Sequence, residues 1–291
     1  MGTTATAQPS APASAAGDPE IGRSIRAAGI LTNYHDLGEG FPALFIHGSG
    51  PGVSAWANWR LVLAPLSQRM RVIAPDMAGF GFTERRADIR YDMDTWVAQA
   101  VGLLDALGIE QANIVGNSFG GHVALRVAHA RPELVSALVL AGSSGLIERT
   151  VVKGAPVRPS REWLVEKIGE LFYDKSKMHP GDVDRAYALL NERGGARAMV
   201  KLSKTARRDN MTDDLGDIHF PTLLIWGKQD VVTPPSAGQG FAELMPNARL
   251  AWLDNCGHAP MIESPDGFAR AMHGFFDELQ NSGFDFQSTG S

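Results

Sequence analysis

Ser118, Asp230 and His258 could together carry out nucleophilic catalysis. They occur along the chain in the order serine, acid, histidine, and each follows a short apolar run that reads as a buried β-strand. In such an arrangement the histidine takes the serine proton as a general base, while the acid fixes the imidazole tautomer and stabilises the imidazolium. The order therefore predicts a serine-dependent hydrolytic site. Taken singly, Asp230 could cap a loop and His258 could be a surface residue.

The segment Gly116–Gly120 (GNSFG) has the pattern G-x-S-x-G between a β-branched run and a helix-forming run. A serine on so sharp a strand-to-helix turn points its hydroxyl away from the sheet, and glycine at the flanking positions lets helix and strand approach closely. The turn also places the Phe119 N–H at a helix N-terminus, where it can face a developing oxyanion. The alternative is an ordinary strand-to-helix turn.

A glycine-rich loop, residues 47–52 (HGSGPG), follows the short apolar strand expected at Ala43–Ile46. In a serine hydrolase of this layout, the loop after this strand donates a second N–H to the oxyanion. We assign that donor to Ser49, with a purely structural turn as the alternative. His47, His122 and His129 are rival bases, but they fall in this loop or on the helix after Ser118, and none has the strand-end position of His258.

Strands and helices alternate along most of the chain, which predicts an α/β fold with a mostly parallel sheet covered by helices on both faces. A helix is expected from Thr95 to Leu107 with Asp94 as its N-cap, because apolar residues recur there at helical spacing. The expected strands are Ser24–Ala27 and Ile30–Tyr34 as a hairpin, Ala43–Ile46, Val72–Ala74, the run before Ser118, Ala137–Leu140, Thr222–Trp226 and Leu250–Leu253.

Between about residues 144 and 216 no convincing strand is found, only helical pieces at Arg161–Phe172, Asp182–Arg193 and Ala196–Arg208. So long an insertion predicts a small helical cap domain over the carboxyl ends of the strands. The last of these helices carries a cationic stripe, which is either a solvated face or a rim that attracts an anionic substrate. The stripe comprises Arg193, Arg197, Lys201, Lys204 and Arg208.

The expected organisation is a disordered tail at 1–18, a core at 19–143 and 217–281, the cap at 144–216 and a flexible tail at 282–291. The net charge of -5 argues against nucleic acid as a partner, and no apolar run is long enough to span a bilayer. The single cysteine, Cys256, excludes an internal disulfide and favours a reducing cytoplasm. No metal motif is present, and no cofactor is expected.

These patterns resemble an α/β-hydrolase, and serine at the turn argues against dehalogenases and epoxide hydrolases, which use aspartate there. A narrower resemblance, strongest over about 19–146, is to the meta-cleavage product hydrolases and nearest to their 2-hydroxymuconic semialdehyde branch. It is carried by five stretches: residues 19–23 (PEIGR), 32–36 (TNYHD), 47–60 (HGSGPGVSAWANWR), 72–81 (VIAPDMAGFG) and 116–121 (GNSFGG). Family members usually have tryptophan directly after the catalytic histidine, whereas this chain has Ala259.

The resemblance implies hydrolysis of a carbon–carbon bond in a 2-hydroxy-6-oxohexa-2,4-dienoate, an anionic small molecule produced by aromatic ring fission. It places Asn58 and Asn117 near the dienoate and implies that Arg185, in the cap, binds the substrate carboxylate with its planar fork. It also implies a homodimer. Two alternatives stay open: a carboxylesterase or lactonase acting on small esters, and a non-catalytic small-molecule binder whose serine is unreactive.

Overall fold

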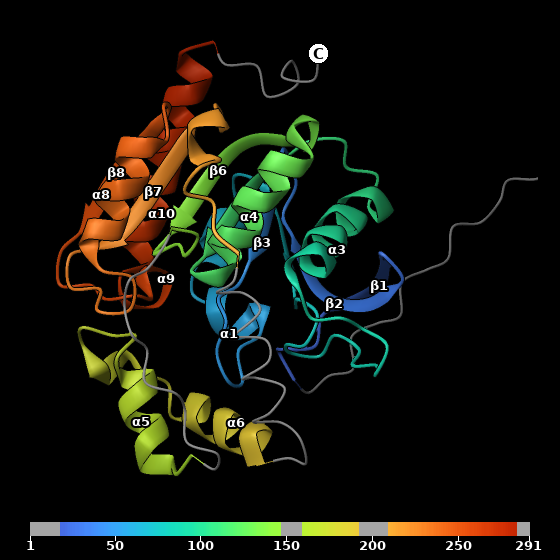
Figure 1. Ribbon diagram of the computed structural model, residues 1–291, viewed down its shortest axis with the longest axis vertical. Helices are drawn as coiled ribbons and strands as arrows, with labels where there is room; N and C mark the ends of the chain where they lie inside the picture. The colour runs from blue at the N-terminus through green and yellow to red at the C-terminus, as the bar shows by residue number, and fades with distance from the viewer. Residues whose placement is uncertain (1–17, 147–158, 192–208, 284–291) are drawn as a thin grey trace, which may run out of the picture.

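The computed structural model describes residues 18–146, 159–191 and 209–283, which fold around one eight-stranded sheet (Figure 1). The strand order is β1-β2-β4-β3-β5-β6-β7-β8, and every pairing from β4 to β8 is parallel, whereas β1 and β2 are antiparallel to their neighbours. This confirms the mostly parallel α/β sheet. The strands are β1 (Arg23–Ala27), β2 (Ile30–Leu37), β3 (Pro42–Ile46), β4 (Arg71–Pro75), β5 (Ala112–Asn117), β6 (Val135–Ala141), β7 (Thr222–Gly227) and β8 (Ala248–Leu253).

Helices cover both faces of the sheet because successive strand side chains point to opposite faces. On β3, Leu44 and Ile46 pack in one apolar cluster while Phe45 packs in the other. The first cluster includes residues of α3 (Met93–Ala106), α4 (Phe119–Ala130) and α8 (Pro235–Leu244). The second includes residues of α1 (Ala55–Trp59), α2 (Leu63–Ser67), α9 (Pro260–Glu263) and α10 (Pro265–Asn281). A 3-10 turn, η1 (Pro132–Leu134), leads from α4 into β6.

The start of α3 differs from the sequence prediction. The N-cap is Asp92, whose backbone is extended and whose side chain accepts a hydrogen bond from Thr95 N at 3.1 Å. Asp94 instead lies in the first turn, where its charge favours the positive end of the helix dipole. Both aspartates suit a helix start, and only the local backbone conformation decides which one caps it.

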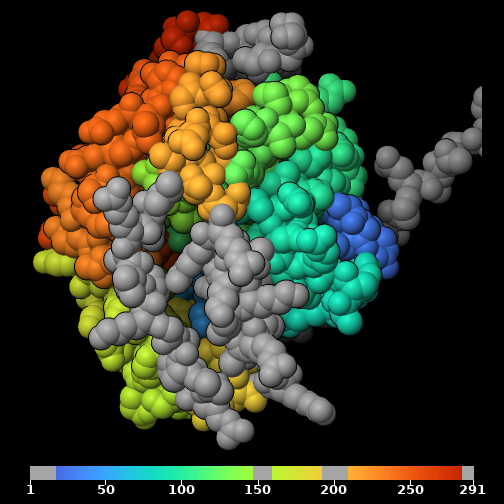
Figure 2. All heavy atoms as spheres, viewed as in Figure 1, coloured from blue at the N-terminus to red at the C-terminus, as the bar shows by residue number. Residues whose placement is uncertain are grey.

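Between β6 and β7 the described residues contain no strand, and they form α5 (Arg161–Gly169), η2 (Lys175–Lys177), α6 (Pro180–Asn191) and η3 (Leu215–Asp217). α5 ends three residues before the predicted Phe172, and α6 begins two residues before the predicted Asp182. The two helices share a small apolar cluster of their own and form the lower end of the molecule, away from α3 and α4 (Figures 1 and 2). The boundaries of a cap at 144–216 stay a prediction.

Several predicted features lie outside the described residues: the tail at 1–17, the helix at 196–208, the cationic stripe and the tail from 284 onward. In the part of the chain that the structure describes, no helix combines the length and apolar character that crossing a membrane requires.

Candidate active site

Ser118 lies on the turn between β5 and α4 with φ 52° and ψ −117°, a backbone conformation that residues with a Cβ rarely adopt. Its N–H donates to Ala141 O at 2.9 Å, and its carbonyl accepts from Gly121 N at 3.0 Å and from Ser144 N at 3.1 Å. These hydrogen bonds hold the strained turn in place, and strain of this kind clusters at functional sites. The side chain is only partly buried, so a reactant can reach it.

The positions of Gly116 and Gly120 require glycine, because backbone atoms of neighbouring elements occupy the space that a Cβ would need. A Cβ on Gly120 would lie 2.0 Å from Ile46 O, and a Cβ on Gly116 would lie 2.3 Å from Gly120 O. α4 therefore packs directly against the end of β3, as the G-x-S-x-G pattern requires.

Asp230 and His258 form a buried pair, with His258 Nδ1 2.8 Å from Asp230 Oδ2. The other carboxylate oxygen accepts from the N–H groups of Val232 and Thr233 at 2.8 Å and 2.9 Å. Since a carboxylate only accepts hydrogen bonds, Nδ1 of the imidazole must carry the proton. Nε2 is then left with a lone pair, which is the state that a general base needs.

The end of β6 brings the serine and the acid–base pair to the same edge of the sheet. β6 lies between β5, which leads to Ser118, and β7, which leads to Asp230. Ala141, the last residue of β6, accepts the Ser118 N–H, and a Cβ on the next residue, Gly142, would lie 3.1 Å from His258 Nδ1 and 3.2 Å from Asp230 Oδ2. The structure thus gathers all three predicted residues around two consecutive positions of one strand end.

The proposed oxyanion donors lie at the start of α4 and in the loop after β3. Phe119 is the first residue of α4, so its N–H has no partner within the helix. Ser49 is exposed in the loop after β3, and the preceding Gly48 N–H donates to Asn58 Oδ1 at 3.1 Å. That hydrogen bond, together with the contacts of His47, holds the loop beside the serine turn.

His47 is a structural residue of this loop. Its Nε2 accepts from Met77 N at 2.9 Å, and its Nδ1 lies 2.6 Å from Gly48 O, so both ring nitrogens are occupied. Burial lowers the pKa of the imidazole, against the opposing effect of Asp76. A neutral ring with Nδ1 protonated satisfies both contacts, which removes His47 from the list of rival bases.

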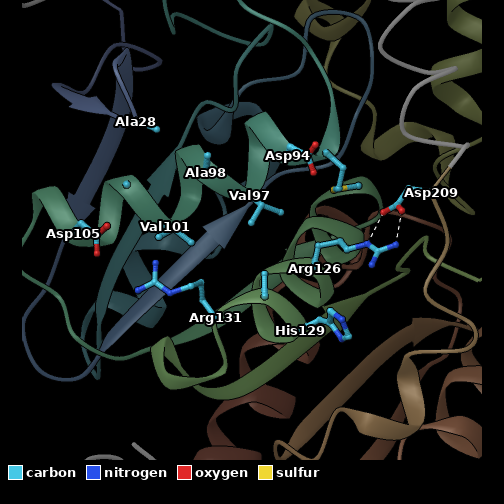
Figure 3. Close-up of a pocket in the computed structure, with 13 residues that line it drawn as sticks. Ala28, Asp94, Val97, Ala98, Val101, Asp105, Arg126, His129, Arg131 and Asp209 are labelled. Atoms are coloured by element: carbon cyan, nitrogen blue, oxygen red, sulfur yellow. Dashed lines mark hydrogen bonds and ion pairs between the residues drawn. The ribbon is translucent and has the colours of Figure 1, made fainter.

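His122 and His129, the other rival bases, lie along α4, and the contacts of both are with residues outside the predicted site. His122 is buried, with Nε2 3.0 Å from Asp209 Oδ2, and burial lowers its pKa to about 4 although Asp209 opposes the shift. His129 is exposed and lines a surface groove of about 760 Å³ between α3 and α4 (Figure 3). The cations in that groove are already paired, Arg126 with Asp209 and Arg131 with Glu133. None of the predicted site residues lines it.

Asn58 and Asn117 converge beside Gly48. A Cβ on this glycine would lie 2.9 Å from Asn117 Oδ1 and 3.5 Å from Asn58 Oδ1. Asn117 Nδ2 donates to Ala141 O at 3.0 Å, whereas Asn58 Nδ2 is buried without a partner among the described residues. Because an unpaired buried donor is costly, Asn58 Nδ2 is a candidate donor to a bound ligand.

Arg185 on α6 is already paired in this structure. Nη1 lies 3.1 Å from Glu20 Oε1, and Nη2 donates to Asp182 Oδ1. Glu20 in turn accepts from Ser54 Oγ at 2.5 Å, so Arg185 links α6 to the start of the core. Its predicted role as a carboxylate binder stays a prediction, and a ligand carboxylate would have to compete with both acids.

Two residues around the site were missed by the sequence reasoning. Glu20, the partner of Arg185, lies in the PEIGR stretch, where the sequence indicates a family resemblance but no role for the glutamate. Thr233, the third residue after Asp230, has its hydroxyl within hydrogen-bonding distance of both Asp230 and His258. No spacing rule identifies either one. Across the described ranges, no group of three or more His, Cys, Asp or Glu side chains is placed to hold a metal ion.

The model of the Alpha/beta hydrolase family matches residues 43–271. The chain is 41% identical over 271 residues to the 2-hydroxymuconate semialdehyde hydrolase of Pseudomonas sp. (strain CF600), covering 89% of this chain and 95% of that protein. It is 37% identical to the 2-hydroxy-6-oxo-2,4-heptadienoate hydrolase of Pseudomonas putida, covering 88% and 96%.

Among solved structures, the meta-cleavage product hydrolase CumD of Pseudomonas fluorescens IP01, in complex with acetates, is similar with a TM-score of 0.82. It is 40% identical, and the match covers 90% of this chain and all of that one. An alignment of 271 residues reaches well past residue 146, where the recognisable motifs end. The likeness therefore includes the second half of the core as well as the first.

Proposed function

This chain belongs to the alpha/beta hydrolase family, and we propose that it hydrolyses the C5–C6 bond of a 2-hydroxy-6-oxohexa-2,4-dienoate. The products are 2-hydroxypenta-2,4-dienoate and a carboxylic acid. The observation that carries the proposal is the buried His258–Asp230 pair at 2.8 Å, placed by the end of β6 beside the strained Ser118 turn. The relatives named for this reaction support the choice of substrate class.

Cleavage of a carbon–carbon bond requires a place for the bonding electrons. Transfer of the 2-hydroxyl proton to C5 converts the dienol into a ketone, with C2=O conjugated to C3=C4. When the C5–C6 bond then breaks, its electrons pass through C4 and C3 to the C2 oxygen. Water supplies the hydroxyl group of the acid and the last proton of the hydroxydienoate, so the reaction needs no oxidant, reductant or cofactor.

Ser118, His258 and Asp230 are assigned to the attack on C6 and to the proton transfer that accompanies it. Ser118 Oγ, or a water held by Ser118 and His258, attacks C6, and His258 Nε2 receives the proton. Asp230 accepts from Nδ1, which keeps the reactive nitrogen unprotonated before attack and stabilises the imidazolium afterwards.

The attack at C6 turns its carbonyl oxygen into an oxyanion, and we assign the N–H groups of Ser49 and Phe119 to it. Deletion of a donor of this kind costs about 3 to 4 kcal/mol in other hydrolases. Asn58 and Asn117, which converge at Gly48, then face the dienoate end of the substrate, and Arg185 is assigned to its carboxylate.

The test is the loss of visible absorbance of 2-hydroxymuconic semialdehyde and of its 6-methyl and 6-phenyl analogues. p-Nitrophenyl acetate and butyrate are measured beside them, with Ser118→Ala as the blank. We expect fast loss of a dienoate with much slower ester turnover. Ester turnover without dienoate loss would replace the proposal with the esterase, and failure of a fluorophosphonate to label Ser118 would favour a binding protein.

We also infer a cytoplasmic location and a homodimer. The single cysteine, Cys256, supports a reducing compartment, and the homodimer rests on the family resemblance. Light scattering after size-exclusion chromatography gives the molar mass in solution, and a mass of one 31.2 kDa chain would contradict the dimer.

A further inference from the structure

The hydroxyl of Thr233 lies against both members of the acid–base pair. It is 2.8 Å from Asp230 Oδ2 and 3.2 Å from His258 Nδ1, and Thr233 is only 2% exposed. With the 2.8 Å distance between His258 and Asp230, these contacts close a triangle of three polar atoms. The side chain that completes the triangle comes from the loop after β7, three residues beyond the acid.

The loop that carries Thr233 is itself held in place. Thr233 N donates to Asp230 Oδ1 at 2.9 Å, and Thr233 O accepts from Trp226 Nε1 at 2.9 Å. Trp226 is fully buried on β7, so the threonine backbone is tied to the core. A hydroxyl on such a backbone has a defined position rather than a range of positions.

The donors and acceptors can be assigned one by one. A threonine hydroxyl has one proton, and its acceptors within reach are Asp230 Oδ2 and Gly142 O, at 2.8 Å and 3.0 Å. Its oxygen lone pairs can also face the Nδ1–H of His258. We assign the hydroxyl proton to Asp230 Oδ2, because this acceptor is the nearer one and is charged. Asp230 then has four donors: two N–H groups on Oδ1, and the threonine hydroxyl and the imidazole on Oδ2. All four hydrogen bonds fix the direction in which the carboxylate faces the ring.

We propose that Thr233 is a positioning residue for the reaction: its hydroxyl sets the orientation of the Asp230 carboxylate and the His258 ring, and so aims Nε2 at the Ser118 proton. Thr233 does not touch the substrate, and it acts through the two residues that its hydroxyl contacts. The inference rests on the proposed function, because it assumes that these residues work as the acid and base of a Ser118 triad.

A set of variants distinguishes positioning of the acid–base pair from a contribution of Thr233 to the stability of the fold. Thr233→Val replaces the hydroxyl with a methyl group and keeps the branched shape. Thr233→Ala removes both the hydroxyl and the methyl group, and Thr233→Ser retains the hydroxyl. The matched control is Thr222→Val, because Thr222 is fully buried at the start of β7, the strand that precedes the Thr233 loop, and its hydroxyl donates to Phe220 O at 2.9 Å rather than to the acid–base pair. Each is measured for kcat and KM on the dienoate, and for the downfield proton resonance of a carboxylate-bonded histidine Nδ1–H.

We expect kcat to fall about tenfold in Thr233→Val and Thr233→Ala with KM unchanged, which corresponds to about 1.4 kcal/mol of lost transition-state stabilisation. Thr233→Ser should restore kcat. The Nδ1–H resonance should move in the two hydroxyl-free variants and stay in place in Thr222→Val. If Thr233→Val fails to fold, Thr233→Ala and Thr233→Ser carry the comparison.

The inference is overturned if the hydroxyl-free variants keep kcat within twofold of the wild type, or if Thr222→Val loses as much. Ser118→Ala distinguishes this failure from failure of the proposed function. If Ser118→Ala is inactive while Thr233→Ala is fully active, only the positioning role is wrong. If Ser118→Ala still turns over the dienoate, the proposed triad is wrong, and the role of Thr233 falls with it.

Discussion

Replacement of Asp230 by asparagine should inactivate the protein without unfolding it, because the structure dictates how the new amide would lie. Two backbone N–H groups, from Val232 and Thr233, point at Oδ1 at 2.8 Å and 2.9 Å. They require an acceptor, so the amide oxygen must take that position. The amide NH₂ then occupies the Oδ2 position, 2.8 Å from His258 Nδ1.

An NH₂ group at this position forces Nδ1 to accept, which moves the imidazole proton to Nε2. A ring protonated at Nε2 cannot take the Ser118 proton. In a serine protease triad the equivalent change lowers kcat by about 10⁴ while the geometry persists, and we expect a loss of that order here. The amide retains both backbone hydrogen bonds and can donate to the Thr233 oxygen, so stability should change by less than about 1 kcal/mol.

The assay is kcat on the dienoate, with urea unfolding to confirm the fold and ¹⁵N NMR of the histidine rings to identify the tautomer. Asp254→Asn is the matched control, because Asp254 is 74% exposed and pairs only with Lys228 at the surface. An Asp230→Asn protein that keeps more than a tenth of wild-type kcat, or whose His258 stays protonated at Nδ1, would refute the tautomer argument.

Three further outcomes are expected. Gly120→Ala should lower the free energy of unfolding by more than about 2 kcal/mol, because its Cβ would lie 2.0 Å from Ile46 O, whereas Gly50→Ala, with open space around it, should leave urea unfolding unchanged. Burial lowers the pKa of His122 from 6.5 to about 4, so the unfolded chain binds more protons than the folded one between these pH values. The free energy of unfolding should therefore fall by up to about 3 kcal/mol as the pH drops through this window. In urea unfolding, this pH dependence should be weaker in His122→Gln and unchanged in His129→Gln. Arg185→Gln should raise KM for the dienoate more than tenfold and leave KM for p-nitrophenyl acetate unchanged, and equal KM changes for both substrates would reduce Arg185 to a link between α6 and Glu20.

Local sequence signals predicted the elements well. Strands β5, β6 and β7 are buried along their whole length, and each contains an apolar stretch that is recognisable in the sequence. The serine turn could be predicted because the close packing of α4 against the strand ends requires glycine at positions near each other in the sequence. The helix cap was wrong by two residues, at Asp94 instead of Asp92, because the two candidates differ only in backbone conformation.

Contacts between distant segments could not be predicted in the same way. The resemblance implies that Arg185 binds a substrate carboxylate, which stays a prediction, but no sequence signal indicated that Arg185 also pairs with Glu20, a residue far earlier in the chain. Asn58 on α1 and Asn117 at the end of β5 meet at Gly48, although they lie on elements far apart in the chain. Pairings of this kind depend on which strand ends become neighbours, and no local periodicity encodes that.

The sequence by itself determined the class of fold, the order serine, acid, histidine, and the positions of these residues at strand ends, because burial and turn chemistry leave a local record in residue type and spacing. Only the tertiary structure decided that β6 lies between β5 and β7, that Ala141 and Gly142 therefore join the serine to the acid–base pair, and that Thr233 supports that pair. The physical reason is that a hydrogen bond depends on ångström-scale distances between side chains, which exist only once the strands have been ordered and packed.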